Sequence, residues 1–146
     1  LGLVAVNLAW FFRPGGTDLR AVALQPYAVL ERPPREAVTR LLLSAFIHSD
    51  AEHLISNMAS LLSAGPAIEA AAGGGSEGAS ALLHAAAITL PLAHALYVGS
   101  AWAERRWYGR SAAYHRDGGV GFSSVGCALA VIAANSGSSG VGGRRE

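Results

Sequence analysis

The chain has 146 residues, of which 51% are hydrophobic and 14% charged, and its formal net charge is +1. This length suits one ordinary domain, and a soluble domain usually carries about a quarter charged residues. The charges gather between Arg13 and Arg40, between Glu104 and Asp117 and at the C-terminal end, with nearly uncharged stretches between them. The pattern favours an all-α, polytopic transmembrane bundle in a lipid bilayer over the alternative, a soluble Ala-rich helical bundle.

Composition also argues against two other classes of site. A net charge near zero does not provide the basic surface that phosphate binding needs, so we expect no nucleic acid partner. Cys127 is the only cysteine, which excludes an internal disulfide and a cysteine-based zinc framework. Its apolar neighbours favour a packing role.

Four hydrophobic helices are predicted. The first occupies Leu1 to Phe12, which is shorter than the roughly 20 residues that a span needs, so we interpret it as a span shortened at its N-terminus. Arg13-Pro14-Gly15-Gly16 ends it. A long polar connection follows to about Arg40, in which Pro26 and Pro33-Pro34 are expected to oppose regular structure.

The second helix begins after a capping signal. Ser49 is the expected N-cap, and Glu52, three residues on, completes a capping box. The helix continues towards Glu69 and ends at the run Gly73-Gly74-Gly75-Ser76.

The third helix is predicted from about Ala79 to Trp102, with a kink at Pro91 that neighbouring helices can absorb. A charged, aromatic loop follows, and the fourth helix is expected from Gly121 to about Ala134. We therefore divide the chain into a transmembrane domain, residues 1–135, and a flexible Gly/Ser-rich tail, residues 136–146.

Three polar residues carry the candidate chemistry. His53 and Asn57 lie four residues apart, so they share one face near the start of the second helix. Ser123 lies near the start of the fourth helix, and one full span separates the two helices, so all three residues fall on the same side of the bilayer. Polar groups at this depth by default mark a functional interior or cavity. Read singly, the pair could instead bond across helices, and a serine among glycines could simply pack.

A Ser nucleophile facing donors from His53 and Asn57 is the arrangement that acyl transfer needs. The segment Gly121-Phe122-Ser123-Ser124-Val125-Gly126 fits the G-x-S-x-G elbow in neither register, and the chain lacks the alternating strands and helices of an α/β-hydrolase. That class of serine hydrolase is therefore excluded.

Two separated motifs resemble the rhomboid family of intramembrane serine proteases. His53-Leu54-Ile55-Ser56-Asn57 looks like the family's H-x-x-x-N helix signature, and Gly121-Phe122-Ser123 looks like its G-x-S-G motif. Gly65 and Glu69 also stand where that signature has a Gly and a Glu. The opening stretch Leu1 to Phe12 and the tripeptide Gly121-Phe122-Ser123 resemble most the endoplasmic-reticulum branch of the family.

The resemblance implies a partial rhomboid fold of about four helices and an endopeptidase that cleaves transmembrane or membrane-proximal segments of protein substrates without a cofactor or metal. Ser123 would be the nucleophile. His53 and Asn57 would stabilise the oxyanion, and Gly121 would allow the close backbone approach. The protein would be a multi-pass membrane protein, with the endoplasmic reticulum as its compartment.

The chain departs from the family pattern at the catalytic base. The family's base is a His downstream of the nucleophile, but no His follows Ser123 here, so we interpret the chain as incomplete. We assign the base to none of His84, His94 and His115, which precede Ser123. Ser124 also replaces the second Gly of the motif. The alternative function is therefore a rhomboid-like pseudoprotease that binds membrane segments without cutting them.

Overall fold

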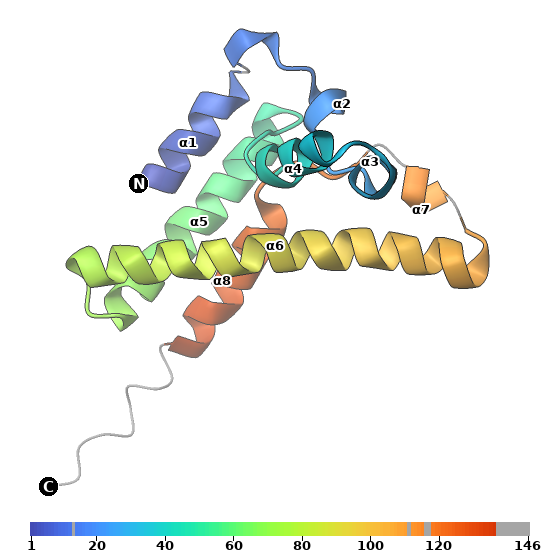
Figure 1. Cartoon of the computed structure of the whole chain (residues 1–146). Helices are drawn as coiled ribbons and strands as arrows, with labels where there is room; N and C mark the ends of the chain where they lie inside the picture. Colours follow the sequence, from blue (N-terminus) through green and yellow to red (C-terminus); the bar gives the residue numbers. More distant parts are fainter. Residues whose placement is uncertain (13, 111, 116–117, 137–146) are drawn as a thin grey trace, which may run out of the picture.

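A computed structural model describes residues 1–12, 14–110, 112–115 and 118–136 and is all-α within these ranges (Figure 1). The helices are α1 (Gly2–Phe11), α2 (Leu19–Val22), α3 (Pro26–Glu31), α4 (Pro34–Leu43), α5 (Ala51–Ala71), α6 (Gly75–Tyr108), α7 (Ala112–His115) and α8 (Ser123–Ser136), with the 3-10 turn η1 (Pro14–Gly16) after α1. No strand occurs among the described residues, where a single isolated bridge joins Leu24 and Gly119. The predicted all-α, partial helical bundle is confirmed.

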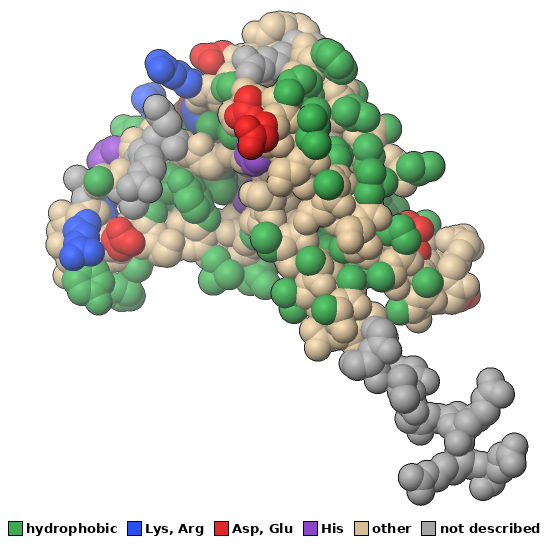
Figure 2. Space-filling view, turned by 180° about the vertical axis from the view of Figure 1, so that it is seen from behind, with side chains coloured by type: hydrophobic (Ala, Val, Ile, Leu, Met, Phe, Trp, Pro, Cys, Tyr) green, Lys and Arg blue, Asp and Glu red, His purple; other side chains and the backbone are tan. Residues whose placement is uncertain are grey.

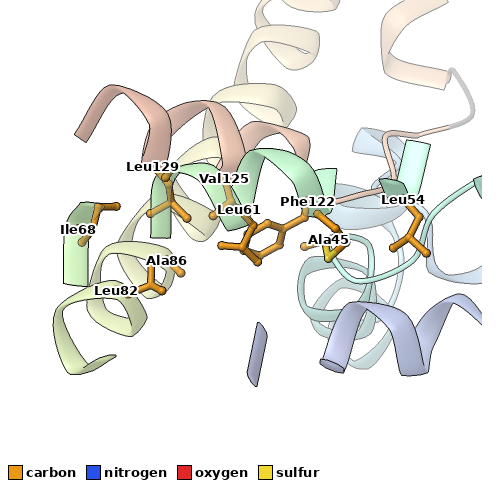
Figure 3. Close-up of a cluster of buried hydrophobic side chains, with 11 residues drawn as sticks. Ala45, Leu54, Leu61, Ile68, Leu82, Ala86, Phe122, Val125 and Leu129 are labelled. Carbon is orange, nitrogen blue, oxygen red and sulfur yellow. The ribbon is translucent and has the colours of Figure 1, made fainter. Parts of the chain in front are cut away.

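The core forms where α5, α6 and α8 meet. α8 packs most extensively on α5, and α6 crosses both helices (Figure 1). Val125 and Leu129 of α8 are fully buried and face Leu61 and Ile68 of α5 (Figure 3). Small residues allow α8 to approach α5 closely. A Cβ atom on Gly126 would lie 3.6 Å from Ser60 Cβ of α5, which is an ordinary van der Waals contact.

Three short helices fill the stretch that was expected to be an irregular connection. Pro26 and Pro34 begin α3 and α4 instead of opposing helix, because the first helical position needs no backbone N–H donor. The segment is held by the buried Arg40 of α4, which donates to the carbonyl oxygen of Ala23 at 2.7 Å and to that of Arg20 at 2.9 Å. The prediction of an irregular connection is therefore wrong.

Helix ends differ from their predicted places in two further respects. The N-cap of α5 is Asp50, whose carboxylate accepts the His53 N–H, and not Ser49. α6 continues six residues beyond Trp102 and ends at Gly109, which adopts a left-handed conformation with φ of 65°. The glycine run after α5 does end that helix, as predicted, and α6 runs through Pro91 without a break.

The predicted tail lies mostly outside the described residues. Ser136 is the last residue of α8, so this helix reaches just into the range expected to be tail, and residues 137–146 are not described. Cys127 is exposed on α8, so the expectation that it packs internally is not met within this chain.

By length and composition, α6 alone among the described helices could cross a membrane, and 22% of its most apolar window is buried. Its exposed side chains include those of Leu83, Ile88, Leu92 and Leu96. Hydrophobic side chains also spread over the surface seen in Figure 2, where the charged side chains form a few separate clusters. An apolar helix that leaves this much hydrophobic surface uncovered suits contact with lipid better than contact with water. α1 and α8 are shorter apolar helices.

Candidate active site

The first turn of α5 orients the His53 side chain. Asp50 caps the helix by accepting the His53 backbone N–H at 2.8 Å. Ser49 lies beside it, with its Oγ donating to Asp50 at 2.7 Å and lying 3.2 Å from His53 Nδ1. The ring is thus held through Nδ1, which leaves Nε2 facing the segment that precedes α8.

Gly121 is the point on which His53 and Asn57 converge. A Cβ atom placed on Gly121 would lie 2.7 Å from His53 Nε2 and 3.0 Å from Asn57 Nδ2, so both nitrogens border the space that a side chain would fill. Its φ of 98° is also one that side-chain-bearing residues rarely adopt. Glycine is required here for both space and conformation.

Asn57 brings a hydrogen-bond donor with no partner. The side chain is 4% exposed, and its Nδ2 makes no hydrogen bond among the residues that the structure describes. A buried, unsatisfied amide costs about 1–3 kcal/mol, so native structures usually avoid it. An unpaired donor aimed at the backbone before α8 is what an anion-binding site needs.

The Gly121 segment is fastened to its surroundings on both sides. The Gly121 N–H donates to the Ser44 carbonyl at 2.7 Å, and the Leu24 N–H donates to the Gly119 carbonyl at 2.9 Å. Phe122 then inserts into the core with 1% of its surface exposed, near Leu61 and Ala45 (Figure 3). The backbone entering α8 is therefore fixed in place against α5.

Ser123 is the first residue of α8, and its side chain is exposed. It opens onto a cavity of about 230 Å³. The polar side chains of this wall belong to Ser44, His94, Tyr97, Ser123 and Ser124. The first N–H groups of a helix have no partner within it and carry the positive end of the helix dipole, which favours negative charge beside Ser123.

The structure thus brings Gly121, His53 and Asn57 together and places Ser123 two residues away, at a helix N-terminus with access from outside. Imidazole and amide nitrogens and the first N–H groups of a helix are the kinds of donor that stabilise a negatively charged oxygen. No hydrogen bond joins the Ser123 hydroxyl to a histidine in the part of the chain that is described.

The three histidines left without a role differ in their surroundings. His94 is buried and lines the cavity onto which Ser123 opens. His84 is exposed on α6, where its Nδ1 lies 2.7 Å from the Ser80 carbonyl oxygen. His115 is exposed on α7, and its ring lies 5.1 Å from that of Tyr27. Neither of the latter two lines the cavity.

Sequence reasoning missed the places of Ser44, His94 and Tyr97 on the cavity wall and one buried neighbour of His53. Ser44 is buried, and its Oγ has no hydrogen-bond partner among the described atoms. His94 falls on the buried stripe of α6 with Ala86 and Val98, so its spacing from apolar residues was the available signal. The position of Ser44 depends on the fold of α2–α4, and nothing in the local sequence indicates it.

His48 is the buried neighbour. Its side chain has no exposed surface, and its ring meets that of His53 edge to face, with the centroids 5.1 Å apart. Burial, and after it the proximity of His53, lowers the pKa of His48 below its ordinary value. His48 therefore packs directly against the ring that faces Gly121.

Within the described residues, no group of three His, Cys, Asp or Glu side chains could hold a metal ion. The site consists of hydroxyl, imidazole and amide groups with backbone N–H donors.

Comparison with known protein families identifies the fold. A family model, the Rhomboid domain, matches residues 35–138, which is more than half of the chain and includes α5, α6 and α8. No curated protein and no solved structure is significantly similar to the chain. The matched range contains His53, Asn57, Gly121 and Ser123, and α1 lies outside it. The chain belongs to the rhomboid family and is a membrane protein.

Proposed function

We propose that the chain is part of an intramembrane serine endopeptidase in which Ser123 is the nucleophile and His53 and Asn57 stabilise the oxyanion. One observation carries the proposal. Two side chains from one face of α5 converge on Gly121, and the unpaired Nδ2 of Asn57 is one of the converging atoms. Gly121 immediately precedes the turn that presents an exposed Ser123.

The reaction assigns a role to each group. The Ser123 Oγ attacks the scissile carbonyl carbon and loses its proton to a base, and the carbonyl oxygen becomes an oxyanion. Nε2–H of His53, Nδ2–H of Asn57 and the first N–H groups of α8 donate to that oxygen. Collapse breaks the C–N bond, the leaving nitrogen takes the proton from the base and departs as an amine, and water then cleaves the acyl-enzyme ester. No residue of this chain is assigned as the base.

The surroundings of Ser123 favour substrates that are themselves membrane proteins. Ser123 opens sideways from the start of α8, and α6 on the other wall of its cavity has an apolar, exposed outer face. A transmembrane or membrane-proximal segment could reach the hydroxyl from the lipid without crossing a charged surface.

Active-site labelling tests the proposal. The full-length gene product would be reconstituted in liposomes with a fluorophosphonate and a model transmembrane substrate. We expect labelling and cleavage that disappear in Ser123→Ala. Ser124→Ala is the matched control, because Ser124 is also exposed and lines the same cavity. Equal loss in both variants, or labelling that survives Ser123→Ala, would show that Ser123 is not the nucleophile.

A rhomboid-like pseudoprotease is the second candidate. It is favoured by the absence of any hydrogen bond between the Ser123 hydroxyl and a histidine in the described ranges. Residues 1–146 alone should therefore bind a substrate helix without turnover. A full-length product that cross-links to a transmembrane peptide but is neither labelled nor active would support this function.

We further infer a multi-pass topology in which α5 and α8 cross the membrane beside α6, and location in the endoplasmic reticulum. The topology is supported by the extensive packing of α5 on α8, and the compartment by the resemblance of the N-terminal stretch and the tripeptide Gly121-Phe122-Ser123 to that branch of the family. Glycosylation sites inserted in each loop and a fluorescent fusion test these two inferences separately.

A further inference from the structure

An apolar groove runs along α6 away from the candidate active site. Its volume is about 710 Å³, and α3 and α4 form its other wall. The lining side chains are almost all hydrophobic, the exceptions being Gly99 and His94, which also borders the Ser123 cavity. Leu30 and Leu42 on the far wall are about half exposed, so the groove is open on one side.

A basic and aromatic cavity of about 380 Å³ follows the groove on the same face of α6. The groove includes Ala95, Val98 and Gly99 of α6, and the cavity continues with Trp102, Arg105 and Arg106 at the same helical spacing. Helix α3 lines both, with Val29 and Leu30 on the groove and Glu31 on the cavity. The two hollows therefore form one strip, apolar at one end and cationic at the other.

One cation in this cavity is unpaired. Glu31 accepts hydrogen bonds from Arg105 and from the Tyr114 hydroxyl, each at 2.7 Å, so its charge is already satisfied. Arg106 has no ion pair or hydrogen bond within the described part of the chain. The lining charges of Glu31, Arg105 and Arg106 leave a surplus of one positive charge.

The dimensions match one leaflet of a membrane. Ala87 and Gly99 are twelve positions apart, which is about 18 Å along a helix, and half of a bilayer's hydrocarbon core is about 15 Å thick. Arg106 lies about 10 Å farther along α6. Trp102 lies between the apolar and cationic ends, and its ring is 5.9 Å from that of Trp107; membrane proteins concentrate such rings at the interface with water.

The chemistry of the strip favours lipid over protein as its occupant. An apolar groove that is open on one side and leads to an unpaired arginine matches an acyl chain joined to an anionic headgroup.

We propose that this strip is a binding site for an anionic phospholipid. An acyl chain lies between α6 and the wall formed by α3 and α4, and the phosphate contacts Arg106 and Arg105 beside Trp102. The site is separate from the Ser123 chemistry, so it depends on the membrane location of the protein and not on its activity.

Fluorescence of Trp102 can report this lipid. Trp10→Phe and Trp107→Phe would leave Trp102 as the sole tryptophan of the chain. The protein would be placed in two kinds of phosphatidylcholine vesicle. One contains phosphatidylglycerol with a nitroxide on its acyl chain, and the other contains phosphatidylcholine with the same label. We expect severalfold preferential quenching by the anionic lipid.

Two pairs of variants then test each end of the strip. Arg106→Gln should lower the preference about fivefold, since one Arg near an anionic surface contributes about 1 kcal/mol. Arg110→Gln, an equal loss of charge at a residue that does not line the cavity, should leave it unchanged. Gly99→Leu should reduce quenching by both lipids by filling the groove, and its Cβ meets no atom within 4 Å, so the helix tolerates it. Ser100→Leu, the exposed neighbour outside the groove, is its control.

Several results would overturn the proposal. Equal quenching by the two lipids would show that the strip has no site for an anionic headgroup. Equal effects of Arg106→Gln and Arg110→Gln would show that the lipid preference comes from the overall surface charge and not from this cavity. Equal effects of Gly99→Leu and Ser100→Leu would place the acyl chain elsewhere. Stoichiometric displacement of the labelled lipid by a transmembrane peptide would assign the groove to a protein helix. Ser123→Ala should leave all of these readings unchanged.

Discussion

Gly121→Ala is the sharpest test of the convergence at the start of α8. The added Cβ would lie 2.5 Å from His53 Cε1, 2.7 Å from His53 Nε2 and 3.0 Å from Asn57 Nδ2. Neither side chain can simply rotate away, because Ser49 holds the His53 ring and Asn57 is buried. The substitution therefore forces α5 and the Gly121 segment apart.

The expected magnitude has two parts. A side-chain-bearing residue held at a φ of 98° costs about 1–3 kcal/mol, and overpacking an interior contact costs about another 1–3 kcal/mol. The free energy of unfolding should fall by about 2–6 kcal/mol in total. Displacing His53 by about 1 Å should also reduce the rate of the chemical step by about a hundredfold in a variant that still folds.

Gly126→Ala provides the matched control on the same helix. Its Cβ would lie 3.6 Å from Ser60 Cβ, an ordinary contact, and replacing a helical glycine gains about 0.5–1 kcal/mol. Unfolding in mixed detergent micelles, followed by circular dichroism, would compare the two variants. His53→Ala added to Gly121→Ala should restore part of the lost stability. Equal stabilities of the two glycine variants would refute the convergence of His53 and Asn57 on Gly121.

Three further outcomes are expected. Asn57→Ala should lower kcat about a hundredfold with little change in KM, and because its Nδ2 is unpaired the fold should not weaken; an unchanged kcat would make Asn57 a packing residue. Hydrogen bonds from Tyr114 and then Arg105 lower the pKa of Glu31 below its ordinary 4.5. The ionised Glu31 therefore contributes fully to the free energy of unfolding above pH 4.5, and this contribution is lost as pH falls through the lowered pKa. The free energy of unfolding measured from pH 3 to 6 should fall accordingly, and Glu31→Gln should remove this pH dependence. Finally, the chain should resist alkaline extraction from membranes, and release into the soluble fraction would contradict membrane insertion.

The parts of the site that the sequence predicted are those determined by local geometry. His53 and Asn57 share a face because helical positions four apart always do. The polar residues before His53 predicted the start of the helix. The end of α5 could also be predicted, because a local run of glycines ends a helix. The sequence could not decide between Ser49 and Asp50 as the N-cap, because either side chain can accept the His53 N–H group. In the structure Ser49 donates to Asp50, and Asp50 accepts from His53.

What the sequence did not reveal depends on contacts between distant residues. The helices α2–α4 are held by Arg40, whose carbonyl partners lie 17 and 20 positions away, so no local pattern predicts their packing. The same is true of Glu31, which binds Arg105 and Tyr114 across more than 70 positions. These contacts place Ser44 beside Gly121, and they shape the apolar groove between α3, α4 and α6.

The distribution of unfavourable features around Gly121 argues for a functional origin. A buried amide nitrogen and a buried histidine, neither with a hydrogen-bond partner among the described residues, each oppose stability, and they lie within one small region. Elsewhere the interface of α5 and α8 consists of apolar and small residues, which shows that this pair of helices packs without such groups. A role in packing would predict that Asn57→Leu improves stability and leaves every activity intact. A role in holding negative charge predicts improved stability together with lost catalysis, so the two measurements made on this one variant separate the explanations.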